Sequence, residues 1–160
     1  MDDLYALAEA VVNDAVHRGL TLATAESLTA GMIAAAIADV PGASKVLLGG
    51  VVSYAFSVKR DVLGVKGIGE DQLVSANCAR QMAEGVRRLT GADIAVSATG
   101  LAGPDGGTAQ TPVGTVFIGC VAGETAETRE YHFTGDRQAV RRETVRQALI
   151  WISNCMKGGQ

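Results

Sequence analysis

Ser27 stands where a short β-like segment, residues 20–25, gives way to an apolar helical stretch that begins at residue 27. A serine in that place has two interpretations. As a helix N-cap, its hydroxyl satisfies an otherwise unpaired amide of the first turn. As a nucleophile, it attacks an electrophilic carbon while the amides at the start of the helix hold the developing oxyanion. The pattern alone leaves both open.

A serine nucleophile needs a base that accepts its proton. The chain has two histidines: His17 falls at a helix position expected to face solvent and His132 in a late strand, so no Ser-His-Asp pattern is visible. A lysine with a lowered pKa suits the task better, and Lys59, five residues after Tyr54, is the candidate. On the pattern alone, an ordinary solvated side chain is the better interpretation of Lys59.

The segment 99–107, TGLAGPDGG, carries four glycines in nine residues. Glycines at that density allow backbone amides to approach a ligand or to surround an anion. The segment matches neither the Walker motif nor GxGxxG. Because Pro104-Asp105-Gly106 is also an ordinary turn sequence, a loop and a ligand site are equally good interpretations.

Arg137, Arg141 and Arg142 fall in the first turns of the last predicted helix, where cations oppose the helix dipole. A phosphate facing them explains this arrangement, because guanidinium groups and backbone amides both bind phosphate. Salt bridges to Glu143 and other carboxylates explain it equally well.

The composition excludes several classes of protein. Of 160 residues, 48% are apolar and 4% aromatic, and the net charge of −3 argues against a nucleic acid partner. Cys78, Cys120 and Cys155 lack CxxC spacing, and no HExxH or DxD motif occurs, so we expect reduced thiols and no metal site. The acidic N-terminus and the lack of a long apolar run predict a cytoplasmic protein without a membrane span.

Alternating helices and strands must position these residues. Hydrophobic spacing predicts helices from Leu4 to a stop at Gly19, over 27–40, over 72–89 and from Asp136 onward, and strands at 20–25, 45–56 (buried), 92–100, 113–123 and 127–135. The last two strands are expected to form an antiparallel hairpin. This order predicts a three-layer α/β/α sandwich with a mostly parallel sheet, in one domain over residues 1–160. Ligands of such sheets bind outside the carboxyl ends of the strands.

Five segments occur in the order found in a known family: TAESLTAG (24–31), SYAFSVKRDVLGV (53–65), SATGLAGPDGGT (97–108), PVGTV (112–116) and FTGDRQAVRR (133–142). On these motifs the sequence resembles the C-terminal domain family of the competence/damage-inducible protein CinA. The resemblance implies a mixed, mostly parallel five-stranded sheet, a homo-oligomer, and an amidase without metal or cofactor. Stand-alone members include nicotinamide-nucleotide amidases, which convert nicotinamide mononucleotide to nicotinate mononucleotide and ammonia.

The resemblance also implies roles for particular residues. Ser27 would be the nucleophile with Lys59 and Tyr54 beside it, and Ser44, in the segment PGASK, is the alternative nucleophile. The residues expected to bind the nucleotide substrate are Glu26, Thr29, Thr99, Gly100, Gly103, Gly106, Gly107, Arg137 and Arg141.

Three residues depart from the family pattern. Leu28 and Ala30 stand where relatives commonly carry cysteine and glycine, and Phe56 stands where they carry asparagine. These departures leave three functions open: an amidase for nicotinamide mononucleotide, an amidase for a different amide, and a nucleotide-binding or regulatory module with weak or no catalysis.

Overall fold

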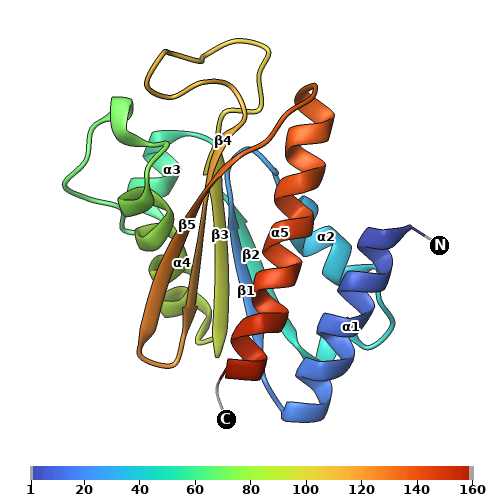
Figure 1. Ribbon diagram of the computed structural model, residues 1–160. Coiled ribbons are helices and arrows are strands. Elements are labelled where there is room, and N and C mark those ends of the chain that lie inside the picture. Colours follow the sequence, from blue (N-terminus) through green and yellow to red (C-terminus); the bar gives the residue numbers. More distant parts are fainter. Residues whose placement is uncertain (1, 159–160) are drawn as a thin grey trace.

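The computed structural model describes residues 2–158 and shows a sheet between two layers of helices (Figure 1). In spatial order the strands are β2 (Leu47–Val52), β1 (Leu22–Glu26), β3 (Ile94–Gly100), β4 (Thr115–Ala122) and β5 (Thr125–His132). Strand β1 pairs in parallel with β2 and β3, whereas β4 runs antiparallel to β3 and β5. Four strands thus share one direction, which confirms the mixed, mostly parallel sheet and the late hairpin.

Helices cover both faces of the sheet (Figure 1). One layer holds α1 (Asp3–Arg18), α2 (Met32–Ala38) and α5 (Arg137–Gly158), and the other holds α3 (Phe56–Asp61) and α4 (Ala76–Thr90). Helix α5 buries one apolar face, which includes Val140, Val145, Ala148, Leu149 and Ile152. The three-layer sandwich is therefore confirmed.

Small residues allow the layers to pack closely. A Cβ added at Gly119 of β4 would lie 2.6 Å from the carbonyl oxygen of Ala79 in α4, so only glycine permits this approach. Gly19 and Gly91 end α1 and α4 in the left-handed conformation, with φ of 67° and 75°. The stop at Gly19 was predicted from the sequence.

Three element boundaries differ from the prediction. The helix expected at residue 27 begins at Met32, after a turn. The strand expected over 45–56 spans only Leu47–Val52, and it is an edge strand whose residues are alternately half-buried and exposed rather than a buried one. The chain then continues into α3, and α4 begins at Ala76 rather than near residue 72. The register with β1 shifts between Leu22 and Ala23, which pair with Leu47 and Gly49.

The parallel strands deliver several segments to one end of the sheet. Strands β1, β2 and β3 all end at the upper edge in Figure 1, where α5 begins and the loop 101–113 projects. Ser27 follows β1 there, and Tyr54 follows β2. This is the end at which an α/β sheet binds its ligands.

Candidate functional site

Ser27 and Lys59 meet at the carboxyl ends of β1 and β2. The amine Nζ of Lys59 lies 3.0 Å from the hydroxyl oxygen of Ser27 and also contacts the carbonyl oxygens of Ser53 and Tyr54. Lys59 reaches them because α3 turns the chain back directly after β2. Its residue is 1% exposed, so the interpretation as a solvated lysine is wrong, whereas Ser27 is half-buried and accessible.

Burial sets the chemistry of this lysine. Desolvation lowers the pKa of Lys59 below its usual value of 10.5, and the Cys78 thiol opposes this effect. A neutral amine keeps two N–H groups and one lone pair. Lys59 Nζ donates to the hydroxyl oxygen of Ser27 and to the carbonyl oxygens of Ser53 and Tyr54. In the neutral amine the two carbonyls still accept the two N–H groups, and the lone pair is free to accept the proton of Ser27. The arrangement can remove the proton from Ser27 and make it a nucleophile.

Glu26, not Ser27, caps the helix that follows. Its carboxylate accepts the backbone N–H of Ile33 at 2.8 Å and of Ala34 at 3.1 Å, in the first turn of α2, and the hydroxyl of Thr24 at 3.1 Å. The capping interpretation of Ser27 is therefore wrong, and so is the expectation that a helix starting at Ser27 supplies oxyanion donors. The buried Glu26, which was expected to bind substrate, holds the turn beside the serine.

The turn after Ser27 has free donors and an unusual backbone. The backbone N–H groups of Leu28 and Thr29 have no acceptor among the described residues. Ala30 has a φ of 47°, in the left-handed region that favours glycine. Leu28 is 3% exposed and its side chain packs in the core, so the side chain that departs from the family pattern faces away from the site, although the Leu28 backbone belongs to the turn. Thr29, a predicted binding residue, is also fully buried.

Tyr54 links the serine and lysine to an arginine. Its hydroxyl accepts a hydrogen bond of 2.9 Å from Arg137, whose other amino group donates to the carbonyl of Gly103 at 2.8 Å. Lys59 donates to the backbone carbonyl of Tyr54 and Arg137 donates to its side-chain hydroxyl, so Tyr54 joins the Ser27–Lys59 pair to Arg137 and the glycine-rich loop. The structure brings all of these predicted site residues together.

Arg141 closes the other side of the turn. Its Nε donates to the carbonyl of Leu28 at 2.8 Å. Neither Arg137 nor Arg141 forms an ion pair with a carboxylate within residues 2–158. Two arginines at this end of the sheet therefore keep an unneutralised positive charge.

Arg142 faces elsewhere. It forms ion pairs with Asp2 and Asp3 at the start of α1, so the salt-bridge interpretation of the arginine cluster holds for this member. The predicted partner Glu143 pairs with Arg146 instead.

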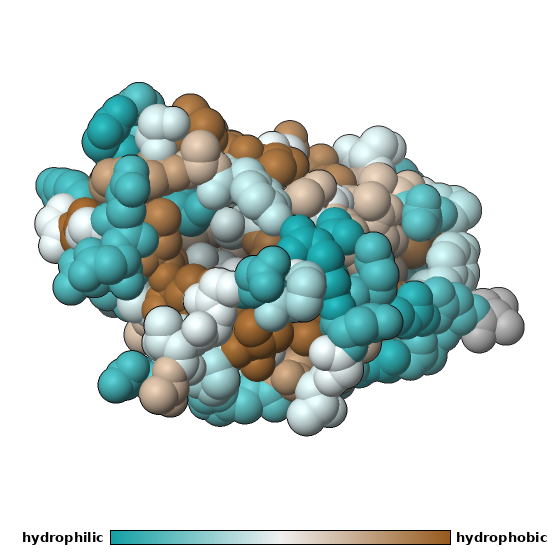
Figure 2. Space-filling view, turned by 90° about the horizontal axis from the view of Figure 1, so that it is seen from above, coloured by the Kyte–Doolittle hydropathy of each residue, from teal (hydrophilic) through white to brown (hydrophobic). Residues whose placement is uncertain are grey.

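The glycines of the loop serve its own conformation. Gly103 and Gly106 have φ values of 81° and 96°, and a Cβ at Gly107 would lie 2.7 Å from the backbone nitrogen of Val113. At Gly100, the end of β3, a Cβ would lie 2.7 Å from a carbonyl oxygen of β4. In Figure 2, which views the molecule from this end, hydrophilic side chains border a hollow that apolar side chains partly line.

Three further positions complete the comparison with the predicted site. The hydroxyl of Thr99 donates to the carbonyl of Leu73 at 2.8 Å. Ser44 is exposed in the 3-10 turn Ala43–Lys45, before the amino end of β2, and does not meet Lys59. Phe56, the third departure from the family pattern, lies under the Arg60 guanidinium, with the ring centroid 5.8 Å away.

The sequence did not indicate Ser53, whose contribution is a backbone carbonyl. Such a group leaves no mark on residue type. Within residues 2–158, no three histidine, cysteine or acidic side chains are grouped so that they could hold a metal ion. No helix in that range has the length and apolar character to cross a membrane.

Comparison with known proteins gives a consistent result. A family model described as the CinA C-terminal domain matches residues 4–156. A CinA-like protein of Thermotoga maritima is 46% identical over 155 residues, which cover 94% of this chain and 37% of that protein. A putative competence-damage inducible protein of Clostridium novyi is 43% identical over 145 residues, 86% of this chain and 34% of that protein. The chain therefore spans about a third of the length of these relatives.

Two solved structures have the same fold. The competence/damage inducible protein CihA of Agrobacterium tumefaciens superposes with a TM-score of 0.90 at 37% identity, covering 97% of this chain and 96% of that one. The competence damage-inducible protein A of Klebsiella pneumoniae subsp. pneumoniae gives 0.92 at 35% identity, over 99% and 100% of the two chains. On sequence and structure together, this chain belongs to the CinA C-terminal domain family.

Proposed function

We propose that this chain is a serine amidase that hydrolyses the carboxamide of nicotinamide mononucleotide, giving the nicotinate nucleotide and ammonia. The observation that carries the proposal is the 3.0 Å contact between the buried amine of Lys59 and the hydroxyl of Ser27. Desolvation without a carboxylate partner lowers the pKa of this lysine, which makes it better able to act as a base. The choice of substrate comes from the family resemblance.

The proposed reaction has two halves. The oxygen of Ser27 bonds to the carboxamide carbon while its proton passes to Lys59 Nζ. Lys59 then returns the proton to the leaving nitrogen, the C–N bond breaks, and ammonia departs from an ester on Ser27. Lys59 next takes a proton from water, whose oxygen attacks the ester, and the bond to Ser27 breaks as the serine regains a proton. Carboxamide and water thus become carboxylate and ammonium.

The oxyanion of each half needs donors that are already in place. The N–H group of Leu28 is suited to this role, because it has no acceptor among the described residues and directly follows the nucleophile. The residue after the nucleophile supplies such a donor in other serine hydrolases. Each donor of this kind contributes about 2.7–4 kcal/mol to lowering the barrier.

An anionic group on the substrate would neutralise the positive charge of the two arginines at the site. Arg137 and Arg141 lack carboxylate partners within the described chain and lie at the end of the sheet that carries Ser27. A phosphate could bind the guanidinium of Arg137 in exchange for its present contacts with Tyr54 and Gly103. This supports a nucleotide rather than an uncharged amide.

Ammonia release from nicotinamide mononucleotide by the purified chain tests the proposal. We expect Ser27→Ala to remove release and Ser44→Ala, a serine at the other end of β2, to retain it. A panel of other pyridine amides and of non-pyridine amides, assayed in parallel, establishes the substrate. Binding of the nucleotide without turnover of any amide would contradict the proposal and favour a nucleotide-binding module.

A further inference from the structure

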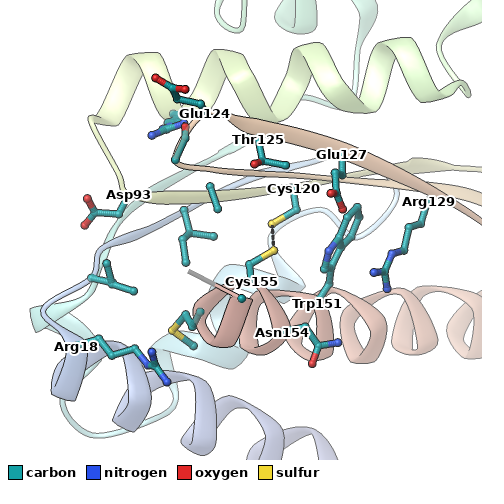
Figure 3. Close-up of a pocket in the computed structure, with 17 residues that line it drawn as sticks. Arg18, Asp93, Cys120, Glu124, Thr125, Glu127, Arg129, Trp151, Asn154 and Cys155 are labelled. Carbon is teal, nitrogen blue, oxygen red and sulfur yellow. Dashed lines mark hydrogen bonds between the residues drawn. The ribbon is translucent and has the colours of Figure 1, made fainter. Parts of the chain in front are cut away.

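A cavity lies at the opposite end of the sheet from Ser27. It has a volume of about 810 Å³ and lies among the end of α1, the β4–β5 hairpin and the last turns of α5 (Figure 3). Its lining includes Arg18, Asp93, Cys120, Glu127, Trp151 and Cys155. The proposed amidase reaction uses none of these residues.

Two free cysteines face each other in this cavity. Cys120 of β4 and Cys155 of α5 are 35 residues apart in the chain, yet their sulfurs are 3.0 Å apart and point toward one another (Figure 3). Two thiolates on one zinc ion, with Zn–S bonds of about 2.3 Å at a tetrahedral angle, would be held about 3.8 Å apart. An S–S bond is about 2.0 Å long. The spacing therefore suits disulfide formation better than a shared metal.

The two thiols are not equivalent. Cys120 is 2% exposed, whereas Cys155 is only half-buried. The hydrogen bond with the Cys120 thiol lowers the pKa of Cys155, and the same bond, with burial, raises the pKa of Cys120. Burial and Glu127 oppose the lowering at Cys155, and Arg129 favours it. Cys155 therefore carries more thiolate character and is the accessible member of the pair.

We propose that Cys120 and Cys155 form a dithiol site that hydroperoxides oxidise to an intramolecular disulfide. The Cys155 thiolate attacks one peroxide oxygen, the O–O bond breaks, and the alcohol or water leaves with a proton, which produces a sulfenic acid on Cys155. The Cys120 sulfur then attacks the Cys155 sulfur, the S–O bond breaks, and water leaves with the Cys120 proton. The dithiol loses two electrons and the hydroperoxide gains them.

The fluorescence of Trp151 can report on the oxidation state of the two cysteines. Trp151, the single tryptophan of the chain, lies one helical turn before Cys155 and also lines the cavity. The guanidinium of Arg129 lies 4.6 Å from its ring centroid. A disulfide formed beside this ring is expected to quench its fluorescence.

The experiment treats the reduced chain with hydrogen peroxide and counts thiols after denaturation. We expect the count to fall from three to one, the mass to fall by two hydrogens, and a peptide map to link Cys120 with Cys155. Dithiothreitol should restore the three thiols and the Trp151 fluorescence. Retention of three thiols, or recovery of the two cysteines as unlinked sulfinic acids, would overturn the proposal.

Three variants separate the roles of the thiols. Cys155→Ser should keep both remaining thiols under the same treatment, and Cys120→Ser should stop at a sulfenic acid on Cys155 that dimedone traps. Cys78→Ser, a buried cysteine of α4 outside the cavity, is the matched control and should still form the disulfide. Equal thiol loss in Cys155→Ser and the unmodified chain would contradict the assignment.

Discussion

The amine of Lys59 lies 3.0 Å from the hydroxyl oxygen of Ser27, although 32 residues separate them in the chain. The contact depends on the parallel pairing of β1 with β2 and on the short helix α3, which returns the chain over the end of β2. The amine is buried without a carboxylate partner. This desolvation makes Lys59 a better base, and it also lowers the stability of the fold when the amine is charged.

The pH dependence of catalysis reports the state of Lys59. Burial lowers the pKa of Lys59, and only the neutral amine accepts a proton. We therefore expect kcat/KM to rise with pH and to reach a plateau above the pKa of Lys59, which lies below 10.5. Lys59→Arg should lose activity at every pH, since a guanidinium does not deprotonate in this range. If kcat/KM of the unmodified chain shows no rise with pH anywhere below 10.5, the role of the lysine as a base is contradicted.

Lys59→Met should leave the fold intact or stabilise it. Replacing a buried ionisable group with an apolar side chain of similar length removes a desolvation penalty, so the free energy of unfolding at neutral pH should be unchanged or higher by up to about 2 kcal/mol. Urea unfolding measures it, with Lys45→Met, on an exposed 3-10 turn, as the control that changes little. A clear loss of stability in Lys59→Met would show that the amine is structural.

The difference in free energy of unfolding between the unmodified chain and Lys59→Met should depend on pH. With its pKa lowered in the folded state, Lys59 binds fewer protons folded than unfolded between that pKa and 10.5. The stability of the unmodified chain must therefore rise with pH across this window relative to Lys59→Met. The advantage of the variant should disappear above pH 10.5, where both states are neutral.

Arg137→Ala should weaken binding of the phosphate. Hydrogen bonds to a charged group are worth about 1.5–3 kcal/mol, so KM for the nucleotide should rise about ten- to a hundredfold with a smaller change in kcat. For the nucleoside that lacks the phosphate, variant and unmodified chain should have similar KM values. Arg142→Ala, which loses only contacts with α1, is the control. If KM rises equally for the nucleotide and the nucleoside, Arg137 does not bind the phosphate.

Ala30→Gly should stabilise the chain. The φ of 47° at Ala30 costs an alanine about 1–2 kcal/mol. Glycine removes this strain but increases the entropy of the unfolded chain, so the net gain in stability should be about 0.5–1 kcal/mol. Ala35→Gly, at an exposed position inside α2, should instead lose about 0.5–1 kcal/mol. Urea midpoints of the two variants should shift in opposite directions. A shift of both in the same direction would contradict the strain at Ala30.

The sequence predicted the elements whose signals are local. Helix α1 shows apolar residues at helical spacing and a glycine stop, and the β4–β5 hairpin joins two β-rich segments through a short turn. Helix α3 was missed because Phe56 and Val58 extend the β-like pattern of the strand before it. The start of α2 was misplaced because its cap is Glu26, seven residues before the N–H of Ile33 that it accepts.

The arrangement of the candidate site was predicted only in part. The family motifs placed Ser27, Lys59, Tyr54 and Arg137 together, and the structure joins them by hydrogen bonds. Spacing could not indicate that Lys59 is buried, because burial depends on a helix that the pattern did not show. Nor could it indicate that Arg142 turns toward α1, since packing of α1 against α5 decides this.

A double-mutant cycle on kcat/KM for ammonia release measures whether Ser27 and Lys59 act as one unit. Proton transfer by a positioned base contributes about 10²–10⁴-fold, and losses within one catalytic unit do not add. We predict that Ser27→Ala and Lys59→Met each reduce kcat/KM by at least about a hundredfold to a common floor, and that the double variant falls no lower. Losses that multiply in the double variant, or a single variant that retains full activity, would contradict the account.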